Sequence, residues 1–116
     1  MVSTVPDYFA FLTALAYGSL LPEALKSQML SDQLKPEQRA GAFPILDSAE
    51  SWGWQIGVNI APGQHSMSVG SYGWTGGSGC SAAVDPAREL IGVVMSQRAM
   101  ATPVDNYDYF WAPLAE

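Results

Sequence analysis

Two serines beside a cluster of glycines are the side chains of this sequence that could act as nucleophiles in acyl transfer. Ser78 and Ser81 lie among Gly76, Gly77 and Gly79. The tripeptide Gly77-Ser78-Gly79 superficially suggests a nucleophile elbow, in which a serine occupies a sharp turn between a strand and a helix. The wider Gly-x-Ser-x-Gly pattern and the helical context are missing around Ser78. Ser78 and Ser81 are therefore candidate nucleophiles without a supporting motif.

A general base and a metal site are harder to assemble from this sequence. His65 is the only histidine, and we expect it to be a solvent-exposed residue of a loop bordered by glycine and proline. Cys80 is the only cysteine, which excludes an intrachain disulfide and a thiolate metal site. Without a carboxylate cluster beside His65, the sequence predicts no metal site and no cofactor.

Composition excludes several classes of partner. The chain carries 11 acidic and 5 basic residues, for a net charge of −6, and the basic residues are scattered. Nucleic-acid binding needs clustered lysine and arginine, so we expect no nucleic-acid partner. The longest apolar stretch, residues 8–17, is too short and too mixed to span a bilayer. No secretory signal is visible at the start, which leaves a cytoplasmic location as the default expectation unless the natural N-terminus lies upstream.

Helices are predicted at the start of the chain, where apolar residues recur every three or four positions. Thr4 is a suitable N-cap with Asp7 in capping-box position, and Gly18 is expected to end the helix. A second helix is predicted to begin at Pro22 and to end near Ser31. The polar segment 32–51 contains two prolines and is predicted to be a long loop.

Strands are predicted from residue 52 onward, because the apolar period changes from helical spacing to strict alternation. Residues 52–60 alternate over the whole segment, which favours one strand with a buried face. Further strands are expected at 67–74 and 80–84, followed by a turn at 85–89. The nearly continuous apolar run 90–95 is typical of a central strand covered on both faces. An aromatic helix is predicted after Pro103. The prediction is thus one α+β domain, residues 1–116, with two N-terminal helices, a three- to four-stranded antiparallel sheet and a C-terminal helix.

An ordered set of short motifs carries a family resemblance along nearly the whole chain. Trp74-Thr75-Gly76 is followed by small residues, by the turn Asp85-Pro86, and by the apolar strand 90–95 ending in Ser96-Gln97. Upstream, the segments 7–12, 30–34 and 52–57 keep the same order. This set resembles the C-terminal portion of the class C β-lactamase-like esterases, a branch of the β-lactamase and penicillin-binding-protein superfamily of serine hydrolases.

The resemblance implies roles for the residues that end the strand. In that family a serine of a Ser-x-x-Lys motif attacks a carbonyl, and a Lys-Thr-Gly strand forms the opposite wall of the cleft. Trp74, Thr75 and Gly76 occupy the place of that triplet, and the backbone N–H of Gly77 would be an oxyanion-hole donor. Tryptophan in place of lysine resembles the esterase branch more than true β-lactamases, because no cation is left to bind a substrate carboxylate.

The nucleophile motif of that family is absent, since no serine of this sequence has a lysine three residues later. Tyr17-Gly18-Ser19 matches the family's Tyr-x-Asn/Ser motif only superficially, because it lies at the end of a predicted helix. We therefore expect the chain alone to be inactive, with acyl ester or β-lactam substrates only after assembly with a complementing N-terminal hydrolase part. One alternative is a non-catalytic module that self-associates as a homo-oligomer or binds a partner. The other is a hydrolase using Ser78 or Ser81.

Overall fold

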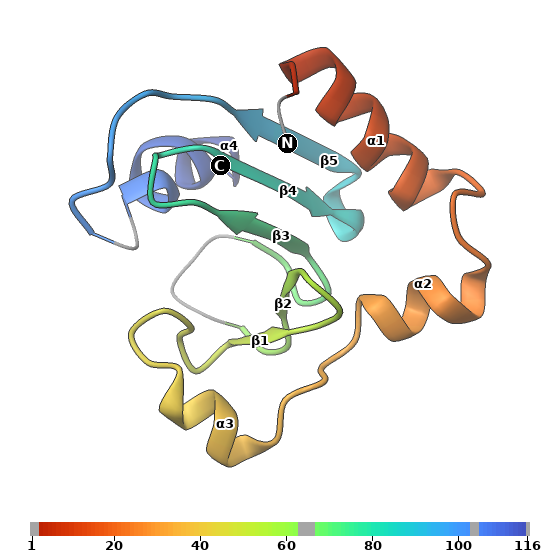
Figure 1. Cartoon of the computed structure of the whole chain (residues 1–116), viewed down its shortest axis with the longest axis horizontal. Helices are drawn as coiled ribbons and strands as arrows, with labels where there is room; N and C mark the ends of the chain where they lie inside the picture. Colours follow the sequence, from red (N-terminus) through yellow and green to blue (C-terminus); the bar gives the residue numbers. More distant parts are fainter. Residues whose placement is uncertain (1–2, 63–66, 103–104, 116) are drawn as a thin grey trace.

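The computed structural model describes residues 3–62, 67–102 and 105–115, and it shows an α+β fold built on one antiparallel sheet (Figure 1). The strand order is β1-β2-β3-β4-β5, so each strand pairs with its neighbour in sequence. The elements are α1 (Val5–Tyr17), α2 (Glu23–Met29), α3 (Pro36–Gly41), β1 (Glu50–Trp52), β2 (Gly57–Asn59), β3 (Tyr72–Thr75), β4 (Ser81–Asp85), a 3-10 turn (Pro86–Arg88), β5 (Leu90–Val94), a π-helical turn (Tyr107–Trp111) and α4 (Ala112–Ala115).

The two N-terminal helices form where the sequence predicts them. The Thr4 hydroxyl accepts a hydrogen bond of 3.3 Å from the Asp7 N–H, so it caps α1. At the other end, the Gly18 N–H donates to the Ala14 carbonyl at 3.0 Å. No helix in the described part of the chain is long and apolar enough to cross a membrane.

The prediction of a long loop over residues 32–51 is wrong, because this segment contains α3 and most of β1. The six-residue helix α3 buries none of its side chains. A helix without a buried face leaves no apolar periodicity in the sequence, so it could not be recognised by that criterion. Pro36 instead marks its first turn.

The predicted single strand over residues 52–60 is in fact a hairpin. β1 ends at Trp52, β2 begins at Gly57, and these two residues are paired across the hairpin. Gln55 in the connecting turn has a φ of +61°, in the left-handed region. Trp54, which the predicted strand would place on its buried face with Trp52, is 46% exposed. The alternation misled the prediction because it continued through the turn without interruption.

The other strands are displaced less. β3 is confined to residues 72–75, because a turn closed by the Ser71 N–H and the Ser68 carbonyl (3.1 Å) precedes it. β5 forms as predicted but lies at the edge of the sheet in the described part of the chain, not at its centre. Its apolar character reflects cover on both faces: α1 packs on one face, and the Trp111 ring lies against Gly92 on the other. Within the described residues the sheet thus has five strands, where three or four were predicted.

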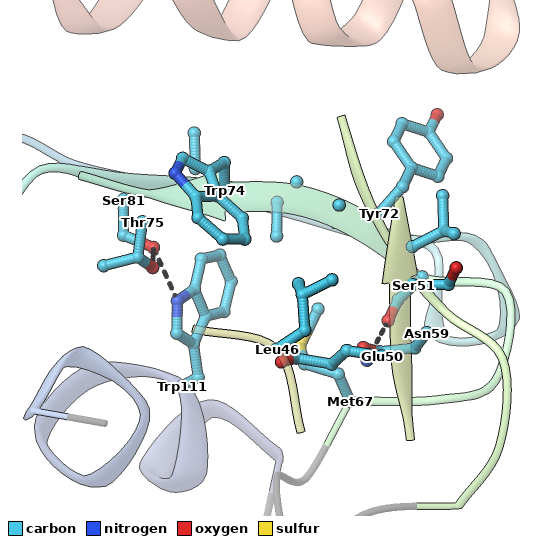
Figure 2. A pocket seen from close by; sticks show the side chains of 16 residues that line it. Leu46, Glu50, Ser51, Asn59, Met67, Tyr72, Trp74, Thr75, Ser81 and Trp111 are labelled. Atoms are coloured by element: carbon cyan, nitrogen blue, oxygen red, sulfur yellow. Dashed lines mark hydrogen bonds between the residues drawn. The ribbon is translucent and has the colours of Figure 1, made fainter. Parts of the chain in front are cut away.

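The core lies between α1 and the sheet. Leu12 and Leu15 of α1 are each 2% exposed and pack against Tyr72 and Val84. The π-helical turn Tyr107–Trp111 and α4, together called the C-terminal helical segment, cover the opposite face of the sheet. In Figure 2, α1 lies above the sheet and this segment lies below it. Trp111 of this segment is 2% exposed and lies against Gly92 of β5.

Candidate functional site

The end of β3 runs into a tight turn, Gly76–Cys80, which we call the glycine turn. The Gly76 N–H donates to the Cys80 carbonyl at 2.8 Å, and the Gly79 N–H donates to the Gly76 carbonyl at 2.9 Å. Gly79 has a φ of +81°, a conformation that favours glycine. β4 then pairs back on β3, with Thr75 opposite Ser81. The turn therefore projects beyond the ends of two central strands.

The Gly77 N–H points out of this turn. The Gly76 carbonyl is directed into the turn by its bond from the Gly79 N–H, and in a planar trans peptide the following N–H points the opposite way. No acceptor for the Gly77 N–H is found among the described residues. A side chain added at Gly77 would meet nothing within 4 Å. An exposed, unpaired backbone donor is the group that anion binding by a main chain requires.

Trp74 lies on the α1 side of the sheet. Its ring makes an edge-on contact with Trp52, with centroids 4.5 Å apart. It also lies over Gly57, where an added Cβ would come within 3.1 Å of the indole. The side chain remains 40% exposed. Trp74 is thus held against the β1–β2 hairpin while one part of its ring faces solvent.

An open, mostly apolar groove of about 730 Å³ separates this tryptophan from α1. Gly76 and Cys80 form part of its wall. Its main side chains are Tyr8, Phe11, Trp74, Val93, Val94 and Met95. The groove also reaches β5, the edge strand of the described sheet.

Thr75 and Ser81 lie on the other face, toward the C-terminal helical segment. Their hydroxyl oxygens are 2.6 Å apart, and Trp111 Nε1–H donates to Ser81 Oγ at 2.9 Å (Figure 2). Ser81 is 4% exposed. Of the two candidate serines, Ser81 is thus buried and hydrogen-bonded, while Ser78 is exposed at the glycine turn. His65 lies outside the described residues.

The structure therefore brings together part of the predicted set. Trp74 and Gly76 face one groove, and Gly77 lies beside them at the turn, whereas the Thr75 hydroxyl points to the opposite face. Within the ranges described, no three His, Cys, Asp or Glu side chains are grouped to hold a metal ion.

Sequence reasoning missed the C-terminal partners of the glycine turn. The Met100 N–H donates to the Gly77 carbonyl at 3.1 Å, and Asn106 Nδ2 donates to the Gly79 carbonyl at 2.9 Å. No local sequence pattern predicts such contacts, because Asn106 lies 27 residues from Gly79. The glycine cluster itself was the available signal, because a left-handed glycine marks a close approach of other chain segments.

Two ionisable groups near the sheet have displaced pKa values. Burial among α1 and the sheet raises the pKa of Tyr72 to about 12, with a smaller contribution from Tyr17. The hydrogen bond from Ser51 is the largest of several contacts, including Arg39, that lower the pKa of Asp32 below its usual 3.8. Neither group lines the groove beside Trp74, so both belong to the scaffold of the site.

Buried Asp85 secures the opposite end of the same strands. Its side chain is fully buried, and Oδ2 accepts a hydrogen bond of 2.9 Å from the Ser68 N–H. Arg88 Nε lies 3.9 Å from the same oxygen. Asp85 thereby ties the turn before β3 to the end of β4, and it has no access to the groove.

Comparisons with known proteins agree with this architecture. The Beta-lactamase family model matches residues 1–115, so the chain belongs to the Beta-lactamase family. A solved β-lactamase structure from Mycobacterium bovis superposes with a TM-score of 0.71 at 22% sequence identity. The match covers 97% of this chain and 43% of that one, so the chain spans less than half of that relative's length. No curated protein matches the sequence. The fold is thus that of part of a β-lactamase-related hydrolase.

Proposed function

We propose that this chain is the C-terminal module of a β-lactamase-family serine hydrolase that cleaves small acyl esters or β-lactams. The observation that carries the proposal is the outward, unpaired N–H of Gly77, the residue that follows Gly76 of the groove wall. In this role the Gly77 N–H accepts no proton and forms no covalent bond. It donates a hydrogen bond to the oxyanion that develops as a serine adds to the substrate carbonyl.

The module supplies one side of that chemistry. A single oxyanion donor stabilises the transition state by about 3–4 kcal/mol. The sequence contains no Ser-x-x-Lys, so the nucleophile, its base and the second donor come from a complementing N-terminal hydrolase part. The coverage of 43% of the M. bovis β-lactamase supports this division, because the larger share of that fold has no counterpart in this chain.

The groove favours neutral substrates. Trp74 presents an apolar surface where a lysine would bind a carboxylate, and the neighbouring groove walls are mainly apolar. An uncharged acyl ester loses little hydration on such a surface, whereas a carboxylate would be left without a cation. We therefore place the activity closer to an esterase than to a β-lactamase.

The experiment is a reconstitution. The chain is co-expressed with the part of the M. bovis β-lactamase that it does not cover, and hydrolysis of p-nitrophenyl butyrate is measured on the purified complex. Gly77→Pro deletes the N–H while fitting the second position of a β-turn, so we expect kcat to fall by about 100-fold or more. The matched control Gly77→Ala keeps the N–H and meets no neighbouring atom within 4 Å. A soluble, assembled complex without activity, or a fully active Gly77→Pro complex, would refute the proposal.

A second candidate, a self-associating module without catalysis, is favoured by the free edge of β5. In the described part of the chain this strand pairs only with β4, and the apolar groove continues to it through Val93, Val94 and Met95. Exposed edges and apolar surface both favour association. Sedimentation of the chain alone tests this: a homo-oligomer that Met95→Lys dissociates supports it, and a monodisperse monomer at high concentration excludes it.

A third candidate, a nucleophile within this chain, rests on Ser78. Fluorophosphonate labelling of the chain alone, with the modified residue mapped, distinguishes it from the reconstituted hydrolase. Because no motif surrounds Ser78, we expect no label, and Ser78→Ala should leave the activity of the complex unchanged. A label on Ser78 would show that this chain contains a reactive serine, and would support Ser78 as the nucleophile.

A further inference from the structure

Three described residues that follow β5, Ser96, Met100 and Asn106, contact the glycine turn. Three hydrogen bonds join them: Met100 N–H to the Gly77 carbonyl at 3.1 Å, Asn106 Nδ2 to the Gly79 carbonyl at 2.9 Å, and Cys80 Sγ to the Ser96 carbonyl at 3.3 Å. Each bond crosses at least 16 residues of sequence. The turn is therefore held from outside as well as by its own two hydrogen bonds.

Packing at Gly79 shows how closely the two segments fit. A Cβ at this position would come within 2.2 Å of the Arg98 carbonyl oxygen and 2.4 Å of Ser96 Oγ. The φ of +81° adds a conformational reason for glycine. No side chain fits between Gly79 and residues 96–98, and the Gly79 carbonyl accepts a hydrogen bond from Asn106.

These contacts leave few ways for the peptide groups of the turn to rotate. The Gly76 N–H, the Gly76 carbonyl, the Gly77 carbonyl and the Gly79 carbonyl all have partners, whereas the Gly77 N–H has none in the described structure. The direction of that free N–H is thus set by the bonds on either side of it. Of the donors that bond these carbonyls, only that of Asn106 belongs to a side chain. A substitution at Asn106 can therefore remove this hydrogen bond without changing a backbone group.

We propose that Asn106 is a positioning residue for the Gly77 N–H, acting through the Gly79 carbonyl and the glycine turn. The role of the Gly77 N–H as an oxyanion donor rests on the proposed function. Asn106 does not touch the substrate; its amide keeps the donor aimed before the substrate arrives. Preorganisation of this kind matters because an oxyanion donor that must reorient during the reaction loses much of its effect.

The test compares Asn106→Asp with Asn59→Asp. Asn106→Asp replaces the donor with a carboxylate oxygen facing a carbonyl oxygen. Asn59→Asp makes the same chemical change where the amide instead bonds Ser71 Oγ at 2.7 Å, away from the turn. The 116-residue chain is labelled with ¹⁵N-glycine, and amide shifts and hydrogen exchange are followed for Gly77, Gly79, Gly57 and Gly92. The Gly77 signal is assigned by its loss in Gly77→Ala.

We expect Asn106→Asp to shift the Gly77 and Gly79 amide signals, and to speed the exchange of the Gly79 N–H, which is bonded to the Gly76 carbonyl, by about tenfold. Gly57 and Gly92 should stay as in the wild type, and Asn59→Asp should leave Gly77 and Gly79 unchanged. Unaltered Gly77 and Gly79 amides in Asn106→Asp would overturn the inference. An equal change at all four glycines would also overturn it, because Asn106 would then stabilise the fold as a whole.

The reconstituted enzyme gives a second readout. Asn106→Asp should lower kcat by about tenfold with little change in KM, since the donor acts in the transition state. A loss confined to KM would contradict positioning of an oxyanion donor. If the wild-type complex is inert, the proposed function fails, and the glycine amides still decide whether Asn106 sets the turn.

Discussion

Trp111 donates a hydrogen bond of 2.9 Å from its indole Nε1 to the hydroxyl of Ser81, and both side chains are almost completely buried. Ser81 Oγ is in turn 2.6 Å from the hydroxyl of Thr75. Three polar groups from β3, β4 and the C-terminal helical segment thus satisfy one another inside the protein. The bond locates the C-terminal segment on the sheet at the point where β3 enters the glycine turn.

Replacing Trp111 with phenylalanine tests how much the hydrogen bond from Trp111 to Ser81 contributes to the free energy of unfolding. Phenylalanine removes the donor to buried Ser81 and also the outer indole atoms that lie against Gly92, so we expect the free energy of unfolding to fall by about 2–4 kcal/mol. Trp54→Phe is the matched control, because Trp54 is 46% exposed, and its effect should stay within about 0.5 kcal/mol. Urea unfolding followed by circular dichroism measures both. Equal stability of the two variants would contradict a stabilising role for the bond.

Gly92→Ala should destabilise the fold through a steric conflict. An added Cβ would lie 2.5 Å from two ring atoms of Trp111, and no flexible side-chain end is available to yield. We expect a loss of about 1–3 kcal/mol, as for overpacking in other cores. Gly41→Ala is the control, since nothing lies within 4 Å of its Cβ position, and alanine in a helix is neutral or slightly stabilising. A tolerated Gly92→Ala would mean that the C-terminal segment is not seated on β5.

Asp32 should make stability depend on acid pH. The Ser51 hydroxyl, the Leu34 N–H and Arg39 all hydrogen-bond this carboxylate, and they hold its pKa below the usual 3.8. A folded-state pKa below the unfolded value stabilises the fold above about pH 4, and this contribution disappears as the pH falls below that value. Since Asp32 is partly exposed, the contribution should not exceed about 1 kcal/mol.

The measurement for Asp32 is urea unfolding at pH 7 and at pH 3. Asp32→Asn should have a lower free energy of unfolding than the wild type at pH 7. Between pH 7 and pH 3, its free energy of unfolding should fall by less than that of the wild type. Glu37→Gln, an exposed carboxylate of α3, serves as the control and should behave as the wild type. A wild type and an Asp32→Asn variant with parallel pH profiles would rule out the assigned interaction.

Trp74→Lys should change substrate preference in the reconstituted enzyme. A lysine at this exposed wall of the groove adds a cation where the wild type offers an indole. We expect the ratio of kcat/KM for a carboxylate-bearing β-lactam over a neutral ester to rise by about tenfold, the usual value of one charged hydrogen bond. Val69→Lys, at a side chain 52% exposed and outside the groove, controls for added charge. The same rise in both variants would show that Trp74 does not line the substrate site.

Much of the fold could be predicted where the signal is local. The capping of α1 by Thr4, the end of that helix at Gly18 and the strand 90–94 follow from cap chemistry and apolar character over neighbouring residues. The hairpin at Trp52–Gly57 and helix α3 could not be read in this way. An alternating pattern that runs through a turn, and a helix that buries no side chain, carry no local mark of what they are.

For the candidate site as well, some features could be predicted from the sequence and others could not. The order of its motifs predicted the family, and the family model over residues 1–115 confirms it. The sequence by itself therefore determined the family and the absence of Ser-x-x-Lys from this chain, whereas the match of Trp74-Thr75-Gly76 to the family's Lys-Thr-Gly triplet stays a prediction. Only the tertiary structure decided that Thr75 faces Trp111 while Trp74 faces the groove, and that Asn106 holds Gly79. These contacts join residues about 30 positions apart, and sheet pairing and core packing set such distances, whereas sequence periodicity reports only on neighbours along one element.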